Sequence, residues 1–479
     1  MEYRDLREWI RQVESVGEVK SLKGCDWNLE IGAVTELVHH REDGPAVFFD
    51  EIKDYPKGYR VLSNSLSSRR RMGLTLGLPP GETKMDFVRA WREKYRRIKP
   101  IPPKVVKDSP FFENVYKEKD IDLLKFPTPK WHEHDGGRYI GTGSIDITRD
   151  PDEGWVNWGT YRVMIHDANT VGFYISPGKH GRIQREKYAS TGRTCKVAMS
   201  FGHDPLIFLG GSIEVPYGVS ESEFIGGIRG EPLQVIEGEY TGLPIPASAE
   251  IVVEGEAIFD EPRIEGPFGE WTGYYGSAER PEPVVRIKRL YHRNDPILLG
   301  SPPGRPPTEV GWYRSYLRSA LIWDEMEKAG VPDVKGVWLM VSGGTRLILV
   351  VSIKQRYPGH ARQAALVASQ CHAGAYLGRY VIVVDDDIDP SNTDEVIWAV
   401  ATRSDPDTDI DILRRCWSGP LDPIIYSSRR GFNSRAIIDA CRPFEWIEDF
   451  PRVAESSKEI LEATAKKWGK ALFSSDEKV

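Results

Sequence analysis

Two proline-rich runs constrain the fold of this 479-residue chain more than any other feature. The first covers residues 98–103 (IKPIPP) and the second covers residues 301–307 (SPPGRPP). Proline fixes φ and has no backbone N–H, so neither run continues a helix or an inner strand. The runs therefore predict connections between three segments. A chain of this length is also expected to contain about three domains, at roughly 150 residues each.

The first two segments differ in their hydrophobic pattern. In residues 1–108, apolar residues recur at helical spacing between positions 6 and 13, and short apolar runs follow at 46–49 and 60–62. This mixture predicts a small N-terminal α/β domain. In residues 109–305, short β-rich runs such as 161–165 and 249–253 alternate with Gly and Pro. That pattern is typical of a barrel or sandwich.

The third segment, residues 306–452, alternates strands and helices. Apolar runs at 346–351 and 380–384 flank an Ala-rich helix expected over residues 360–376. This order predicts a C-terminal α/β domain with some parallel strands. The tail, residues 453–479, is expected to form a helix that packs either on its own domain or on a neighbouring subunit.

Composition excludes several classes of protein. Hydrophobic residues make up 40% and charged residues 28%, and the formal net charge is -7. No block of Lys and Arg indicates nucleic-acid binding. The five cysteines form no CxxC pair, so neither a disulfide framework nor a zinc site is indicated. No apolar run reaches the roughly 20 residues of a membrane span, and the N-terminus lacks a signal-peptide pattern. A cytoplasmic protein without a membrane partner is expected.

A short acidic stretch in the second segment suggests chemistry. Glu265 and Glu270 are separated by Gly-Pro-Phe-Gly, which disfavours a helix. The stretch predicts a tight turn that holds two acids over one spot. Paired acids in different surroundings can have different pKa values, so one site can contain a proton donor and a charged partner. The alternative is a Gly/Pro turn with two solvated acids.

Further polar residues of the same segment could hold a metal ion. Asn157, His180 and Glu221 offer oxygen and nitrogen atoms suited to Mn²⁺ or Mg²⁺. Three such ligands leave room for phosphate oxygens and water. Their spacing alone favours structural roles over a metal site. A second candidate, residues 132–135 (HEHD), is interpreted as a polar surface loop rather than a metal site.

The order of these motifs resembles the UbiD family of reversible decarboxylases. The resemblance rests on Asn-x4-Arg at 157–162, Pro-Gly-x-His at 177–180, Ser-Glu-x-x-Phe-x-Gly at 220–226 and Glu-Gly-Pro-x-Gly-Glu at 265–270. Residues 351–355, 359–362 and 384–389 fit the family as well. The resemblance implies prenylated FMN in a split β-barrel, with its phosphate bridged to a divalent metal, usually Mn²⁺, and with K⁺ often nearby.

The resemblance also implies roles for individual residues. The implied metal ligands are Asn157, His180 and Glu221, the implied catalytic network is Arg162, Glu265 and Glu270, and the implied flavin contacts also include Thr160, Tyr161 and Lys179. One segment departs from the family. Many members have Ser-Lys-Met-Gly-Ile-Asp-Ala-Thr where residues 434–441 are SRAIIDAC. Arg435 keeps the charge of the family lysine at a cofactor-binding position but has a different geometry.

The implied function is reversible, non-oxidative decarboxylation of an aromatic, heteroaromatic or α,β-unsaturated acid. Loss of CO₂ leaves charge that a cofactor must take up, while the protein orients the carboxylate, excludes water and returns a proton. The implied partners are the acid, CO₂, a flavin prenyltransferase that supplies the cofactor, and further copies in a homodimer or homohexamer. The alternative is a flavin-binding split-barrel reductase or carrier without decarboxylase activity.

Overall fold

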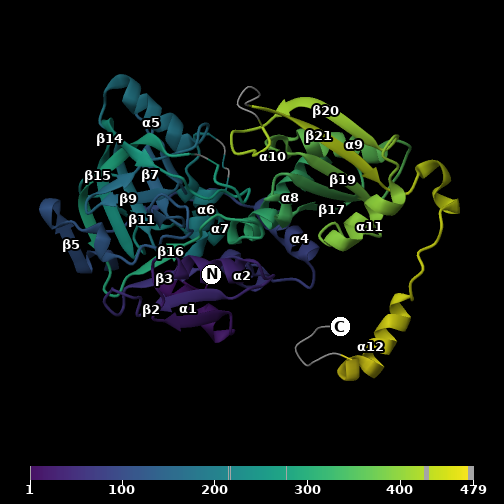
Figure 1. The fold of residues 1–479 in the computed structure, drawn as a ribbon, viewed down its shortest axis with the longest axis horizontal. Coiled ribbons are helices and arrows are strands. Elements are labelled where there is room, and N and C mark those ends of the chain that lie inside the picture. Colours follow the sequence, from purple (N-terminus) through teal and green to yellow (C-terminus); the bar gives the residue numbers. More distant parts are fainter. Residues whose placement is uncertain (1, 214, 216, 277, 426–430, 473–479) are drawn as a thin grey trace.

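The computed structural model describes residues 2–213, 215, 217–276, 278–425 and 431–472. Within these ranges the chain forms two bodies, with helix α8 (Glu309–Lys328) between them, as Figure 1 shows. The N-terminal and central segments form the larger body, and the C-terminal segment forms the smaller one. Helix α12 (Lys458–Leu472) projects from the smaller body at the end of an extended connection.

The N-terminal segment contains a four-stranded sheet of order β1-β2-β3-β16. Helix α1 begins after Asp5, whose side chain accepts a hydrogen bond from the N–H of Glu8, and it buries its apolar face. The elements are α1 (Leu6–Ser15), β1 (Val19–Lys23), α2 (Glu30–His39), β2 (Ala46–Asp50), β3 (Arg60–Ser63), α3 (Arg69–Leu76), α4 (Lys84–Tyr95) and β16 (Ile297–Gly300). Strand β16, at the end of the central segment, pairs with β3 and so joins this sheet. The predicted domain borders at 108, 305 and 452 stay predictions.

The central segment confirms the predicted split barrel. Its nine-stranded antiparallel sheet curls into a half-barrel of order β6-β9-β10-β15-β14-β11-β7-β8, with β5 paired to β15. The strands are β5 (Asn114–Lys117), β6 (Arg138–Gly141), β7 (Ile145–Arg149), β8 (Val156–Gly159), β9 (Val163–Asp167), β10 (Thr170–Gly172), β11 (Lys196–Phe201), β14 (Ile251–Glu265) and β15 (Arg280–His292). The helices are α5 (His180–Thr191), α6 (Pro205–Ser212) and α7 (Glu221–Arg229). A small sheet, β13-β12-β4, joins β4 (Lys104–Val105), β12 (Gln234–Glu237) and β13 (Pro244–Pro246).

The C-terminal segment is an α/β unit with the expected parallel strands. Its sheet has the order β17-β18-β19-β21-β20, in which β18, β19 and β21 run parallel. The elements are β17 (Val334–Leu339), β18 (Ile348–Ile353), α9 (His360–Gln370), α10 (His372–Ala375), β19 (Tyr380–Asp385), α11 (Thr393–Arg403), β20 (Ile410–Trp417) and β21 (Phe432–Ala440). The single helix predicted over 360–376 is wrong. Cys371 has an extended backbone (φ -63°, ψ 158°) that divides it into α9 and α10.

Helix α8 packs against both neighbouring segments. The ring of Tyr316 lies 5.2 Å from that of Phe87 on α4 and 4.9 Å from that of Trp338 on β17. Asp324 of α8 forms an ion pair with Arg96, which follows the last residue of α4, at 2.7 Å. It forms a second ion pair with Arg92 of α4. One apolar core therefore extends from the N-terminal helices through α8 to the C-terminal sheet, while a second core fills the half-barrel.

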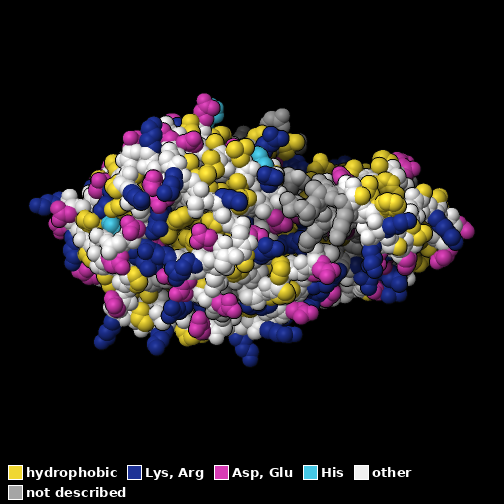
Figure 2. Space-filling model, turned by 90° about the horizontal axis from the view of Figure 1, so that it is seen from below, with side chains coloured by type: hydrophobic (Ala, Val, Ile, Leu, Met, Phe, Trp, Pro, Cys, Tyr) yellow, Lys and Arg dark blue, Asp and Glu magenta, His cyan; other side chains and the backbone are white. Residues whose placement is uncertain are grey.

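Side chains of both charges are mixed over the face in Figure 2, and hydrophobic side chains gather on the projecting lobe that contains α12. Four large apolar residues of this helix are each more than half exposed: Ile460, Leu461, Trp468 and Leu472. Every helix in the described ranges is too short or too polar to cross a bilayer.

Candidate active site

The acid loop (residues 265–270) brings two carboxylates to one guanidinium. Glu265 ends β14, and Gly266 follows with φ +85°, a conformation that glycine adopts without strain. Arg162 lies between β8 and β9. Its Nη2 is 2.7 Å from Oε2 of Glu265, and its Nη1 is 3.0 Å from Oε1 of Glu270. One cation therefore contacts both acids of the loop.

The carboxyl group of Glu270 is tuned to exchange a proton near neutral pH. Burial raises the pKa of Glu270 to about 7 against the opposing charge of Arg162, and the charge of Glu265 adds to the rise. Arg280 and Arg314 also face this group and favour its ionised form. At neutral pH both protonation states of Glu270 are populated, as a general acid requires.

Aromatic side chains surround the ion pair. The guanidinium of Arg162 lies 4.2 Å from the ring centroid of Tyr174. The hydroxyl of Tyr139 donates to Oε1 of Glu265 at 3.2 Å, and its ring stacks on Phe268 at 3.9 Å. No local pattern in the sequence singles out either tyrosine, because only the tertiary fold brings them to the loop.

The C-terminal body covers the acid loop from another side. The side chains of Leu421 and Glu270 both approach Gly276, where a Cβ would lie 2.9 Å from a methyl carbon of Leu421 and 2.7 Å from Cγ of Glu270. The ring of Trp271 packs on Gly344, where a Cβ would lie 2.6 Å from a ring carbon. The second body therefore approaches the acid loop and the residues that follow it.

The predicted metal-binding residues lie around the first turns of two helices. His180 and Glu221 are the first residues of α5 and α7, and their Nδ1 and Oε1 atoms are 3.7 Å apart. The second oxygen of Glu221 accepts from the N–H of Trp158 at 2.7 Å. Asn157 donates through Nδ2 to the hydroxyl of Tyr161 at 3.3 Å, so its carbonyl oxygen is the atom suited to a cation.

Tyr161 connects this group to helix α5. Its hydroxyl accepts a hydrogen bond from the N–H of Gly181 at 3.1 Å as well as from Asn157. Among the described residues, no three His, Cys, Asp or Glu side chains are arranged to hold a metal. The predicted set contains only two residues of these types, and its third ligand is an amide oxygen.

Two further predicted contacts flank the same region. Thr160 donates its N–H to the carbonyl of Gly211 at 3.1 Å, while its buried Oγ1 has no hydrogen-bond partner among the described residues. Lys179 is exposed and directly precedes α5. A buried hydroxyl without a partner among the described residues is available to a polar ligand.

Arg435 lies elsewhere. Its side chain is buried in the C-terminal segment and donates to the carbonyls of Ser369, Ala375 and Trp417, the last at 3.0 Å. The contacts of this residue therefore connect α9, α10 and β20. The structure does not bring Arg435 together with the other predicted cofactor-binding residues.

Residues 132–135 do not form the expected surface loop throughout. Glu133 and His134 are exposed, but Asp135 is only 4% exposed and its Oδ2 accepts the N–H of His132 at 2.9 Å. The next residue, Gly136, donates its N–H to the carbonyl of Pro267 at 2.8 Å. This run therefore forms the back of the acid loop, a role that needs the tertiary fold.

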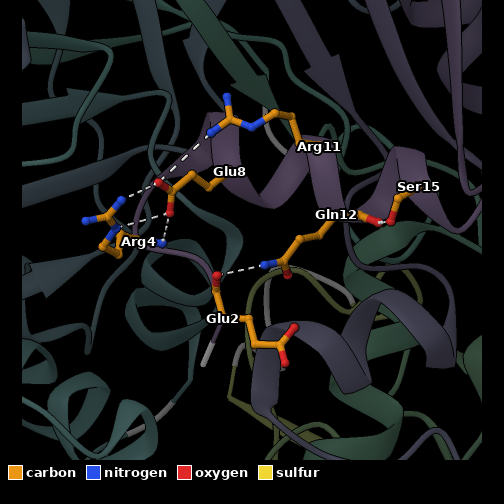
Figure 3. A pocket seen from close by; sticks show the side chains of 6 residues that line it. All are labelled: Glu2, Arg4, Glu8, Arg11, Gln12 and Ser15. Atoms are coloured by element: carbon orange, nitrogen blue, oxygen red, sulfur yellow. Dashed lines mark hydrogen bonds and ion pairs between the residues drawn. The ribbon is translucent and has the colours of Figure 1, made fainter.

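Two hollows lie outside this group of residues. Figure 3 shows one on the exposed side of α1, where Arg4 and Glu8 form an ion pair at 2.8 Å. The other, about 190 Å³, lies behind the acid loop and is lined by His39, His132 and Gly269 among others. Neither hollow is lined by Arg162, Glu265 or Glu270. The candidate active site is therefore identified from the contacts and charges of its residues, not from a cavity.

Three family models match consecutive parts of the chain. They describe the N-terminal, Rift-related and C-terminal domains of 3-octaprenyl-4-hydroxybenzoate carboxy-lyase, and they match residues 10–91, 104–306 and 312–440. The chain belongs to the UbiD family. The predicted resemblance is confirmed.

Characterised UbiD relatives cover nearly the whole chain. Pyrrole-2-carboxylic acid decarboxylase of Pseudomonas aeruginosa is 33% identical over 92% of this chain and 91% of its own length. A phenolic acid decarboxylase of Sedimentibacter hydroxybenzoicus is 33% identical, with 92% of each chain covered. The expected class, a UbiD decarboxylase, is confirmed, and the reductase or carrier alternative receives no support from these relatives.

Solved structures show the same fold. The open form of vanillic acid decarboxylase from Sedimentibacter hydroxybenzoicus has a TM-score of 0.84 at 31% identity, covering 98% of this chain and 100% of its own. The UbiD-class enzyme HmfF from Pelotomaculum thermopropionicum, in complex with FMN, has a TM-score of 0.84 at 30% identity, covering 95% and 98%.

Proposed function

We propose that this UbiD protein catalyses the reversible, non-oxidative decarboxylation of an aromatic or heteroaromatic acid with prenylated FMN and a divalent metal. The observation that carries the proposal is the pair of acids on Arg162, in which Glu270 has a pKa of about 7. The relatives named for pyrrole-2-carboxylic and phenolic acids favour ring acids over the unsaturated aliphatic acids that the sequence analysis also left open.

The residues of the acid loop would carry out the protein's part of the reaction. Arg162 would orient the substrate carboxylate, since a guanidinium forms charge-assisted hydrogen bonds with such a group. Glu265 would stay ionised as the partner of Arg162. Glu270 would return the proton to the carbon that lost CO₂, a general-acid step that contributes roughly 10²–10⁴-fold. The chemistry that prenylated FMN supplies when bound is to take up the charge left on that carbon.

The cofactor would be held where the two helix N-termini meet. Asn157, His180 and Glu221 would hold Mn²⁺ or a similar ion, which would supply positive charge for the phosphate of the cofactor. Support comes from the short distance between His180 and Glu221 and from the two solved structures of HmfF, one in complex with FMN and one with prenylated FMN. Thr160, Tyr161 and Lys179 would complete the flavin contacts, and K⁺ would lie nearby.

Arg435 is left out of the proposed cofactor site. Its hydrogen bonds to three carbonyl groups of the C-terminal segment support a structural role. A lysine could not make all three contacts with the same planar geometry.

The substrate would lie between the two bodies. Support comes from the approach of Leu421 to Gly276 beside Glu270 and from the contact of Gly344 with Trp271, since closure of such a cleft excludes water. The proline-rich run at 301–307 would act as a stiff hinge. The vanillic acid decarboxylase relative has been solved in both an open and a closed form.

The tail helix would contact a second copy of this chain. Leu461, Trp468 and Leu472 recur at helical spacing and are exposed, and burying such an apolar stripe is favourable. A dimer or a hexamer would both satisfy this surface, and one HmfF relative is titled as an evolved dimeric form. A flavin prenyltransferase as cofactor supplier and a cytoplasmic location stay predictions.

Expression together with a flavin prenyltransferase tests the proposal. The purified protein should contain Mn²⁺ and an absorbing flavin, and it should release CO₂ from pyrrole-2-carboxylate or a hydroxybenzoate. The product carbon should also exchange hydrogen with deuterated solvent. A fully loaded protein that releases no CO₂ from any ring acid but oxidises a reduced nicotinamide would support the reductase alternative instead.

A further inference from the structure

We propose that Tyr139 is a positioning residue for the reaction: its hydroxyl keeps Glu265 turned toward Arg162, and its ring holds the acid loop that carries Glu270. This role rests on the proposed function, in which Glu270 donates the proton. The described hydrogen bonds of the Tyr139 side chain go to Glu265 and Pro267, and none goes to Asn157, His180 or Glu221 or to helices α5 and α7.

The hydroxyl of Tyr139 completes the surroundings of Glu265. Tyr139 is on β6, and both it and Glu265 are at most 1% exposed. Its hydroxyl lies 3.2 Å from Oε1 of Glu265, whereas Oε2 lies 2.7 Å from Arg162. Each carboxylate oxygen therefore has one donor from a different strand or loop, which fixes the plane of the group.

β6 and the residues just before it lie behind the acid loop. The ring of Tyr139 stacks on Phe268 at 3.9 Å with an interplanar angle of 29°. Gly136, two residues before β6, donates its N–H to the carbonyl of Pro267 at 2.8 Å, and a Cβ at Gly136 would lie 2.0 Å from the carbonyl oxygen of Gly266. The ring of Tyr139 and the backbone at Gly136 therefore both contact the acid loop.

These contacts decide which acid carries the proton. An ionised Glu265 can accept from both Arg162 and Tyr139, but a protonated one loses an acceptor site. Burial and the charge of Glu265 raise the pKa of Tyr139 well above its ordinary value, so the hydroxyl remains a donor. Within the described ranges, Glu270 has no side-chain donor beyond the ion pair with Arg162, and it is the acid left with the proton.

The other charged groups around the pair do not replace Tyr139. His166 also approaches Glu265: its Nε2 and the Cγ of Glu265 lie 3.5 and 3.7 Å from the position of a Cβ on Gly172. Burial lowers the pKa of His166, so it adds no positive charge near neutral pH. Arg280 and Arg314 act on Glu270.

The variant Tyr139→Phe tests this role, because it keeps the stacked ring and removes only the donor. Glu265 should then protonate more readily and compete with Glu270 for the proton. We expect kcat to fall about tenfold and its acidic limb to move up by about one to two pH units, the worth of one hydrogen bond to a charged group. KM and flavin content should change little.

A second measurement needs no turnover. In the Glu270→Gln background only Glu265 of the pair can titrate, and its protonation is visible as a carboxyl band in infrared difference spectra. Adding Tyr139→Phe should make this band appear at a pH about one to two units higher. An unchanged band position would overturn the proposal.

Tyr291→Phe is the matched control. Tyr291 is also buried in the barrel sheet, and its hydroxyl donates to a buried acid, Glu254, at 3.0 Å. This variant should lower stability without moving the pH profile or the infrared band. If both variants lower stability alike and neither moves the profile, Tyr139 is merely structural. If the band moves but the loaded wild type decarboxylates no acid, Tyr139 still positions Glu265 and the proposed function fails.

Discussion

A guanidinium nitrogen of Arg162 lies 3.0 Å from a carboxylate oxygen of Glu270, which follows it by 108 residues in the chain. The same guanidinium also forms an ion pair with Glu265, so two largely buried acids share one cation. If both acids were ionised, this group would carry a net negative charge, which burial disfavours. Burial therefore favours retention of a proton on one of the two acids, and Glu270, with a pKa of about 7, is the acid that carries it.

The variant Glu270→Gln should remove the proton donor and keep its shape. We expect kcat for decarboxylation and the rate of H/D exchange to fall by roughly 10²–10⁴, the contribution of a general acid. Flavin and Mn²⁺ content should stay at the wild-type level, as measured by absorbance and metal analysis. Turnover near the wild-type rate in the fully loaded variant would assign the acid role to another residue, with Glu265 as the first candidate.

Leu421→Ala should change the pH dependence by admitting water to Glu270. Since burial is the main cause of the raised pKa of Glu270, its loss should lower that pKa toward the ordinary value. The protonated form is the active one, so activity is lost as the pH rises, and the alkaline limb of kcat should move down by about one pH unit. Leu366→Ala, at an exposed position of α9, is the control. Coincident pH profiles for both variants and the wild type would exclude a shielding role for Leu421.

His180→Ala should release the metal and the flavin together. The imidazole is 3.7 Å from Glu221 at the start of α5, so its loss removes a ligand and leaves the acid without its neighbour. Metal analysis and flavin absorbance after purification should both fall well below wild-type values. His372→Ala, exposed on α10, should leave both unchanged. Full Mn²⁺ occupancy in the first variant would show that the ligand assignment is wrong.

Arg435→Lys should affect stability rather than cofactor content. The guanidinium contacts three carbonyl groups, and an ammonium group cannot reach all of them, so buried acceptors would lose their donors. We expect a loss of about 1–3 kcal/mol in the free energy of unfolding. Denaturant titration and flavin absorbance separate the two roles. Loss of flavin without loss of stability would show that Arg435 contributes to cofactor binding.

Trp468→Asp should weaken the association of subunits. This side chain is 51% exposed on α12, and a charge there would prevent burial of the apolar stripe. Light scattering should report a smaller mass than for the wild type. Lys466→Asp changes charge on the same helix without touching the stripe and should keep the wild-type mass. Equal masses for all three proteins would mean that the tail helix does not contribute to the contact between subunits.

Local patterns in the sequence determined much of this protein. Proline cannot continue a helix, so the runs near residues 100 and 304 could be recognised as connections without knowledge of the fold. The alternation of short strands and turns predicted a barrel or sandwich, the resemblance to the UbiD family implied the split barrel, and the period of apolar residues predicted α1. The spacing of Glu265 and Glu270 singled out a turn with two acids, because that information lies within six neighbouring residues.

Only the tertiary structure decided how these parts meet. The pKa of Glu270 depends on burial and on the charge of Arg162, which lies 108 residues away in the chain. Tyr139 on β6 reaches Glu265 at the end of β14 although three strands separate β6 from β14 in the order of the sheet, and no pattern near residue 139 encodes that contact. Arg435 was assigned from its motif position, yet its surroundings direct it to carbonyl groups of its own domain. Sequence patterns record local backbone preference and periodicity, whereas contact and desolvation arise only when distant segments pack together.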